Sequence, residues 1–172
     1  MRALLAGEPA FSAELVEPAA EPLLAPLVQP PFAADEADGL DLILEGFLLH
    51  HGRPRHLAPS EPGREVLAGD YCYAHGLVRM AAAGDLFVVE ALANLIALGA
   101  GLVAAGAPDG LVPLWRATTL AIADRRGPRE AETAHRFLDA QAALRHGGDA
   151  GPLAALAAEL PPTPGLAEAL TP

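Results

Sequence analysis

Residues 52–98, GRPRHLAPSEPGREVLAGDYCYAHGLVRMAAAGDLFVVEALANLIAL, decide how this chain folds. Within them, the segment VLAGDY (66–71) opens an apolar helical pattern, and a second such pattern follows Gly84 and Asp85. Apolar residues three and four positions apart are typical of helices that bury one face. The pair Asp70 and Tyr71 stands where a helix that enters a core would normally carry aliphatic side chains. This polar pair therefore indicates either a functional site or a structural polar contact at the edge of the core.

The composition predicts an all-α fold, a single helical bundle domain spanning residues 1–172. Hydrophobic residues make up 52% of the chain and aromatic residues only 5%. Ala and Leu dominate, and both form helices readily, whereas the β-branched and aromatic residues that favour strands are scarce. A chain of 172 residues is also long enough to bury a substantial core. We expect a Pro-rich N-terminal segment over about 1–32 and a Pro-rich tail over about 161–172 that frays.

Helical periodicity predicts the elements between these two ends. Asp85 and Asp109 are expected to cap the helices that follow them. The helix after Asp85 is apolar nearly all round, which is typical of a helix in the middle of a bundle. The expected helices cover about 33–51, 64–82, a stretch from 86 onward, a stretch from 110 onward, 128–146 and 152–160, and the second is expected to bury Leu67, Tyr71, Ala74, Val78 and Ala81.

Charge and composition narrow the possible partners. The formal net charge is −11, and all eleven cationic side chains are Arg. Nucleic acid is therefore excluded as an expected partner, because phosphate contacts need clustered positive charge. The absence of Lys excludes Schiff-base chemistry and a phosphate-binding P-loop. Cys72 is the only cysteine and cannot form an internal disulfide, which fits a reducing cytoplasm. We expect a cytoplasmic protein without a secretory leader.

The uncharged run from Ala91 to Ala107 could suggest a membrane span. It contains Asn94 and three glycines, and it is shorter than the roughly 20 residues that a span needs. We therefore expect a buried core helix and a chain that is not transmembrane.

Familiar catalytic patterns are missing from the sequence. No His-x3-His or Cys-x2-Cys pair is present, so a structural zinc site is not expected. His50 and His51 are adjacent and point to different sides of a helix, so they cannot both face one ion. Ser60 lies in a Pro-flanked loop without the glycines of a nucleophile elbow.

Two short motifs follow one another along the chain, a turn and then the start of a helix. Gly52, Arg53, Pro54 and His56 form a turn, and Leu67, Gly69, Asp70 and Tyr71 open the next helix. In this order and spacing the chain resembles the trans-polyprenyl diphosphate synthases over about residues 40–98. Members of that family carry DDxxD, then RRG-x-P-T-x-H, then a helix with L-x-G-D-Y/F. The resemblance implies part of the all-α isoprenoid synthase fold, and it implies that Arg53, His56, Asp70 and Tyr71 lie near a prenyl diphosphate.

The same resemblance implies a degenerate metal site. Counting back from Gly52 places the family's aspartates on Asp41, Leu42 and Glu45. In active synthases these carboxylates hold Mg²⁺ ions that grip the diphosphate and polarise its departure. Asp41 and Glu45 share a helical face, but Leu42 cannot bind a hard cation. One Mg²⁺ is possible, whereas the usual cluster is not, so we expect no cofactor of the chain's own.

This chain has about half the length of a full synthase, keeps the helix with Gly69, Asp70 and Tyr71, and lacks the intact aspartate motifs. In these respects it resembles component I of heptaprenyl and hexaprenyl diphosphate synthases. That resemblance implies a non-catalytic small subunit, which pairs with a catalytic polyprenyl synthase subunit and helps to set prenyl chain length for quinone synthesis. One alternative is a minimal Mg²⁺-dependent prenyl transferase or terpenoid synthase that uses Asp41, Glu45 and Asp70. Another is a helical adaptor with no prenyl role, in which Asp70 and Tyr71 are structural polar residues at the edge of the core.

Overall fold

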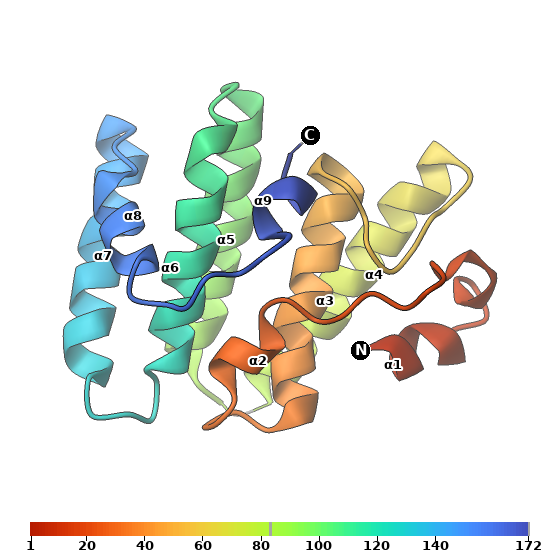
Figure 1. Cartoon of the computed structure of the whole chain (residues 1–172), viewed down its shortest axis with the longest axis horizontal. Helices are drawn as coiled ribbons and strands as arrows, with labels where there is room; N and C mark the ends of the chain where they lie inside the picture. Colours follow the sequence, from red (N-terminus) through yellow and green to blue (C-terminus); the bar gives the residue numbers. More distant parts are fainter. Residues whose placement is uncertain (83, 172) are drawn as a thin grey trace.

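A computed structural model describes residues 1–82 and 84–171 of the chain. In this part of the chain the fold is all-α, as predicted, and the β pairing is limited to one isolated bridge between Leu15 and Leu57 (Figure 1). The helices are α1 (Arg2–Gly7), α2 (Ala25–Val28), α3 (Ala34–His51), α4 (Pro62–Ala81), α5 (Leu86–Ala104), α6 (Leu111–Ala123), α7 (Glu130–Gly147), α8 (Gly151–Ala157) and α9 (Leu166–Ala169), with 3₁₀ turns η1 (Ser12–Glu14) and η2 (Pro108–Gly110).

Helix α3 is the centre of the bundle. From Ala37 to Leu49 nearly all of its side chains are buried, whichever way they point. It packs against α2, α4 and α5, and its contact with α4 is the most extensive in the chain. Phe47 of α3 meets the ring of Trp115 of α6 with centroids 5.5 Å apart, and Trp115 is fully buried. A helix covered on all sides sets the position of every element around it.

Glycines bring α3 and α4 unusually close together. Gly39 faces Gly76, and Gly46 faces Gly69. A Cβ added at Gly76 would come within 2.6 Å of Ile43 Cγ1 and 2.7 Å of the Gly39 carbonyl oxygen. A Cβ at Gly46 would come within 2.9 Å of the Gly69 carbonyl oxygen. We call this contact the glycine seam. It has no room for side chains at these four positions, so the two backbones pack directly on each other.

The face of α4 that enters the core differs from the predicted one. The buried residues are Ala68, Gly69, Cys72, Gly76 and Met80. The predicted stripe lies on the opposite side of the helix, where Leu67 is 55% exposed and Val78 is 70% exposed. The prediction was wrong because hydropathy favours Leu and Val, while close approach of two helices favours Gly, Ala and Cys.

One of the two predicted helix caps is confirmed. The Asp85 side chain accepts a hydrogen bond from the Phe87 N–H at 3.0 Å and caps α5. Arg125 donates to the same carboxylate from its Nε, at 2.7 Å, and ties the start of α5 to the turn after α6. Asp109 does not cap α6, because η2 intervenes and Gly110 takes the cap position.

The C-terminal segment packs against the bundle and does not fray as predicted. Leu166 and Leu170 are 1% and 2% exposed, and the Ala169 carbonyl accepts a hydrogen bond from the Arg53 N–H at 3.0 Å. Arg116 of α6 holds the approach to this segment by donating to the carbonyls of Ala157, Leu160 and Pro161 and to the Thr163 hydroxyl. Figure 1 shows this last stretch crossing in front of α6 to reach α3.

The N-terminal segment is also ordered by contacts with α3 and α4. It forms a second, smaller core beside the main one. This core contains the fully buried Cys72 of α4. Its other buried members are Leu5, Phe11, Leu42, Leu49, Leu57 and Ala68.

Candidate functional site

Asp41, one of the two predicted metal ligands, anchors the N-terminus of α2. Its side chain is buried on α3, and its Oδ1 accepts from the Leu23 N–H at 2.8 Å. Its Oδ2 accepts from the Ala25 N–H at 2.6 Å, and the Leu24 N–H lies 3.2 Å from both oxygens. A carboxylate is well suited to this place, because the first N–H groups of a helix have no partner within the helix.

Glu45 anchors the loop between α3 and α4 in the same way. Its carboxylate accepts from the backbone N–H groups of Arg55, His56 and Leu57 at 2.8 to 3.1 Å. Burial raises the pKa of both Asp41 and Glu45, and the backbone hydrogen bonds act in the opposite direction.

A cation at Asp41 or Glu45 would therefore have to compete with backbone N–H groups for these oxygens. Among the described residues, no group of three or more His, Cys, Asp or Glu side chains is placed to hold a metal ion. A Mg²⁺ site at this position stays a prediction, while the structural role of both carboxylates is evident from their contacts.

His56 and Arg53 lie at the same loop but in different surroundings. His56 is 3% exposed, and no hydrogen-bond partner of its Nδ1 occurs in the described part of the chain. Burial lowers the pKa of His56 to about 4, helped by the positive charges of Arg55, Arg2 and the N-terminus. Arg53 instead lines an open hollow of 330 Å³ with Arg55 of the loop and Glu168 of α9.

Asp70 and Tyr71 lie on α4, where they contact different neighbours. The Asp70 side chain is 67% exposed, and its Oδ1 lies 3.3 Å from His50 Nε2 of α3. The His50 ring stacks on Tyr73, with centroids 5.3 Å apart. Tyr71 is half-buried between Phe11 of the N-terminal segment and His75. Asp70 is thus a surface residue whose partner is a histidine of the neighbouring helix.

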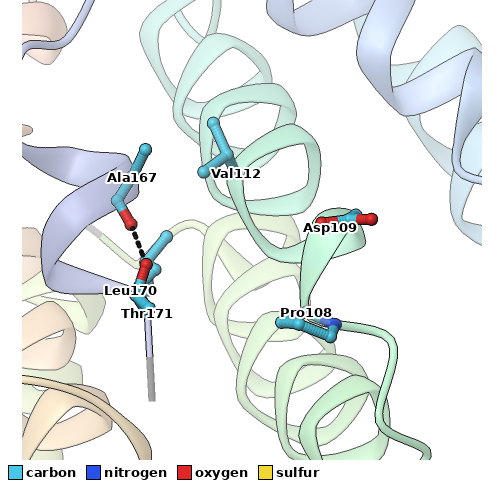
Figure 2. Close-up of a pocket in the computed structure, with 6 residues that line it drawn as sticks. All are labelled: Pro108, Asp109, Val112, Ala167, Leu170 and Thr171. Atoms are coloured by element: carbon cyan, nitrogen blue, oxygen red, sulfur yellow. Dashed lines mark hydrogen bonds between the residues drawn. The ribbon is translucent and has the colours of Figure 1, made fainter.

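The six predicted residues do not converge on one cavity. Asp41 and Glu45 face the core, Arg53 lies beside α9, and Asp70 points to solvent from α4. A further hollow, of 340 Å³, lies between α9 and the η2–α6 corner (Figure 2). Among the described residues that line it, Asp109 is the one with a charged side chain, and the Thr171 hydroxyl donates to the Ala167 carbonyl at 2.9 Å. This hollow lacks the paired groups that acid–base or nucleophilic chemistry needs.

The most distinctive surface of the molecule is apolar and belongs to α4 and α5. Helix α4 turns its buried face to α3 through the glycine seam, and α5 turns its buried face to α6, α4 and, through Gly99 against Phe47, to α3. Their other faces consequently point away from the bundle. We call this surface the outer face; it consists of Leu67, Asp70, Ala74, Val78 and Ala81 of α4 and Leu86, Glu90, Ala93, Ala97, Gly101 and Ala104 of α5, all exposed.

The outer face carries three of the large exposed hydrophobic side chains of the described chain. Leu86 is 81% exposed, in addition to Leu67 and Val78 described above. On α5 the exposed positions are mainly Ala and Gly, which permit close approach of another helix. Toward α7 the surface continues into an apolar groove of 290 Å³, whose lining includes Ala97, Gly101 and Leu144.

Helix α5 is long and apolar enough to cross a membrane, by length and composition alone, and 28% of it is buried in the fold. This is weak evidence for a span, because the core helix of a soluble protein passes the same test. The helix was predicted to be central and buried, whereas one side of it is open. The prediction missed this side because a helix that is apolar all round gives no sign of which face has a partner within the chain.

A sequence signal for the outer face does exist. Gly39 and Gly46 are seven residues apart, and so are Gly69 and Gly76. Two glycines at a heptad spacing on consecutive helices indicate that the helices meet along those glycines. That pairing would have turned Leu67 and Val78 to the outside.

Comparisons with models of protein families, with curated proteins and with solved structures gave no match to this chain.

Proposed function

We propose that this protein is the non-catalytic small subunit of a heteromeric polyprenyl diphosphate synthase and that it binds the catalytic subunit through the outer face. The observation that carries the proposal is the exposure of large apolar side chains on α4 and α5. Large exposed apolar surfaces mark interaction sites in soluble proteins. Two of these side chains, Leu67 and Val78, lie on α4, the helix that also carries Gly69, Asp70 and Tyr71 of the family resemblance.

The contacts of Asp41 and Glu45 support a subunit without its own catalysis. At the positions that the family resemblance assigns to Mg²⁺ ligands, this chain uses its carboxylates to hold backbone N–H groups of α2 and of the α3–α4 loop. Leu42, at the third position, is fully buried in the smaller core. The helix register of the family is kept in this proposal, but its acidic residues stabilise the fold.

The test is co-expression with a catalytic long-chain synthase encoded in the same genome. We expect a stable complex in size-exclusion chromatography with light scattering, and a longer product from allylic and homoallylic diphosphates than the catalytic subunit makes alone. The variant V78E should abolish both effects, because it buries a charge in the interface. L138E is the matched control: Leu138 is an exposed leucine of α7, 46% accessible and outside the outer face.

Two results would contradict the proposal. The first is the absence of both a complex and a change in product length. The second is prenyl product formed by this chain alone with Mg²⁺, which would instead support the minimal transferase.

A further inference from the structure

We infer that the outer face binds a helical protein partner that brings cationic side chains opposite Asp70 and Glu90, and that it does not bind a second copy of this chain. The identity of the partner rests on the proposed function, but the charge of the partner surface does not. It follows from the polar residues that lie among the apolar ones.

Both charged side chains of the outer face are acidic. Asp70 lies beside Ala74 on α4, and Glu90 lies between Leu86 and Ala93 on α5. Within the described residues, the partner of the Asp70 carboxylate is the imidazole of His50, at 3.3 Å. Within the described residues, no hydrogen bond or ion pair engages the Glu90 side chain. Two acids on an apolar surface lose hydration when that surface is covered, so the covering protein has to supply compensating cations.

Two cations that border the outer face already have partners in this chain. Arg79 of α4 pairs with Asp35 at the start of α3. Arg145 of α7, which borders the α5 groove, donates to Asn94 Oδ1 at 3.0 Å. In a symmetric dimer the same patch meets itself, so acids would approach acids or apolar groups. Such a dimer leaves the charges of Asp70 and Glu90 uncompensated.

The outer face is also poorly suited to binding a membrane. The chain has a net charge of −11, and the anionic surface of a bilayer repels it. Glu90 lies in the first half of the helix that would have to enter the bilayer. A protein surface that combines apolar and basic residues satisfies both properties of the outer face.

The first test titrates two synthetic helical peptides into the 172-residue chain. One carries Leu and Ala on one face with Arg beside them, and its twin carries Glu in place of Arg. We expect the basic peptide to bind in titration calorimetry and the acidic twin not to bind. The variant D70N/E90Q should weaken binding by about tenfold. The control E132Q/D139N removes the same charge from exposed positions of α7 and should change affinity less than twofold.

Equal weakening by both double variants would overturn the inference, because it would show attraction to net charge alone. Circular dichroism melting of each variant verifies that it is folded. Sedimentation of the wild-type chain should show a monomer, and flotation with anionic or zwitterionic vesicles should show no binding. A dimer or vesicle binding that V78E abolishes would also overturn the inference.

The inference and the proposed function can fail separately. If the basic peptide binds at the outer face and no synthase does, the proposed function is wrong and the inference stands. If a synthase binds D70N/E90Q as tightly as the wild type at low salt, the proposed function stands and the inference is wrong.

Discussion

The two sides of α4 are both apolar, yet they differ in what covers them. The inner side carries Gly69 and Gly76 and is closed by α3 at backbone distance. The outer side carries Leu67 and Val78 and has no cover within the described chain. Apart from Met80, which is fully buried, the inner side is made of small residues, whereas Leu67 and Val78 are large and exposed. The seam thus uses small residues for close approach, while two large apolar side chains of the same helix remain available for another molecule.

The largest difference in stability between the buried interior and the outer face is expected for two glutamates, Glu45 of α3 and Glu90 of α5. E45A should lower the free energy of unfolding by about 4 kcal/mol, because it leaves two buried backbone N–H groups and one part-buried N–H group without their acceptor. E90A, on the outer face, should change it by less than about 0.5 kcal/mol. Urea unfolding of both variants measures the difference. A loss below 1 kcal/mol for E45A would show that water replaces the carboxylate.

Two glycines should respond with opposite signs. G76V should destabilise the chain by about 3 kcal/mol, since its Cβ meets Ile43 and the Gly39 carbonyl in the seam. G101A should stabilise it by about 0.5 kcal/mol, because the Cβ meets nothing within 4 Å and Ala favours the helix. Thermal melting of the two variants tests this pair. Equal effects would mean that the seam can open to admit a side chain.

The buried His56 should make stability depend on pH. Its pKa is about 4 in the folded chain and about 6.5 in the unfolded one, so the unfolded state binds the proton more readily between these values. Its contribution is present above pH 6.5 and is lost as the pH falls toward 4, by about 2 kcal/mol between pH 7 and pH 5.

Asp41 and Glu45 act with the opposite sign in this range. Their pKa values are raised by burial, so acidification favours their folded, protonated forms. The measurement is therefore the difference between wild type and H56Q in urea unfolding from pH 7 to pH 5. Parallel curves for the two proteins would show that His56 does not remain neutral.

The smallest effect is expected on the outer face itself. V78S should change the stability of the isolated chain by less than about 0.5 kcal/mol, because Val78 is 70% exposed. M80A, two residues along the same helix, removes a fully buried side chain and should cost about 3 kcal/mol. A cost above 1 kcal/mol for V78S would mean that the outer face is covered in solution, and sedimentation would then identify a dimer.

Much of the fold could be predicted from the sequence, because periodicity and caps are local. The expected helix over 33–51 is α3, and Asp85 caps α5 as predicted. The orientation of α4 could not be read from hydropathy, since it depends on glycines of another helix. The site was less predictable still: the roles of Asp41 and Glu45 depend on loops that return from residues 23–25 and 55–57.

The contact between Arg53 and Ala169 has a consequence for the order in which the chain assembles. The glycine seam joins consecutive helices, so α3 and α4 can pair early on a growing chain. The loop between them is completed only when α9 docks and the Arg53 N–H donates to the Ala169 carbonyl. Before α9 docks, the chain presents the outer face without a finished α3–α4 loop. A partner that recognises both elements would therefore select chains in which α9 is in place.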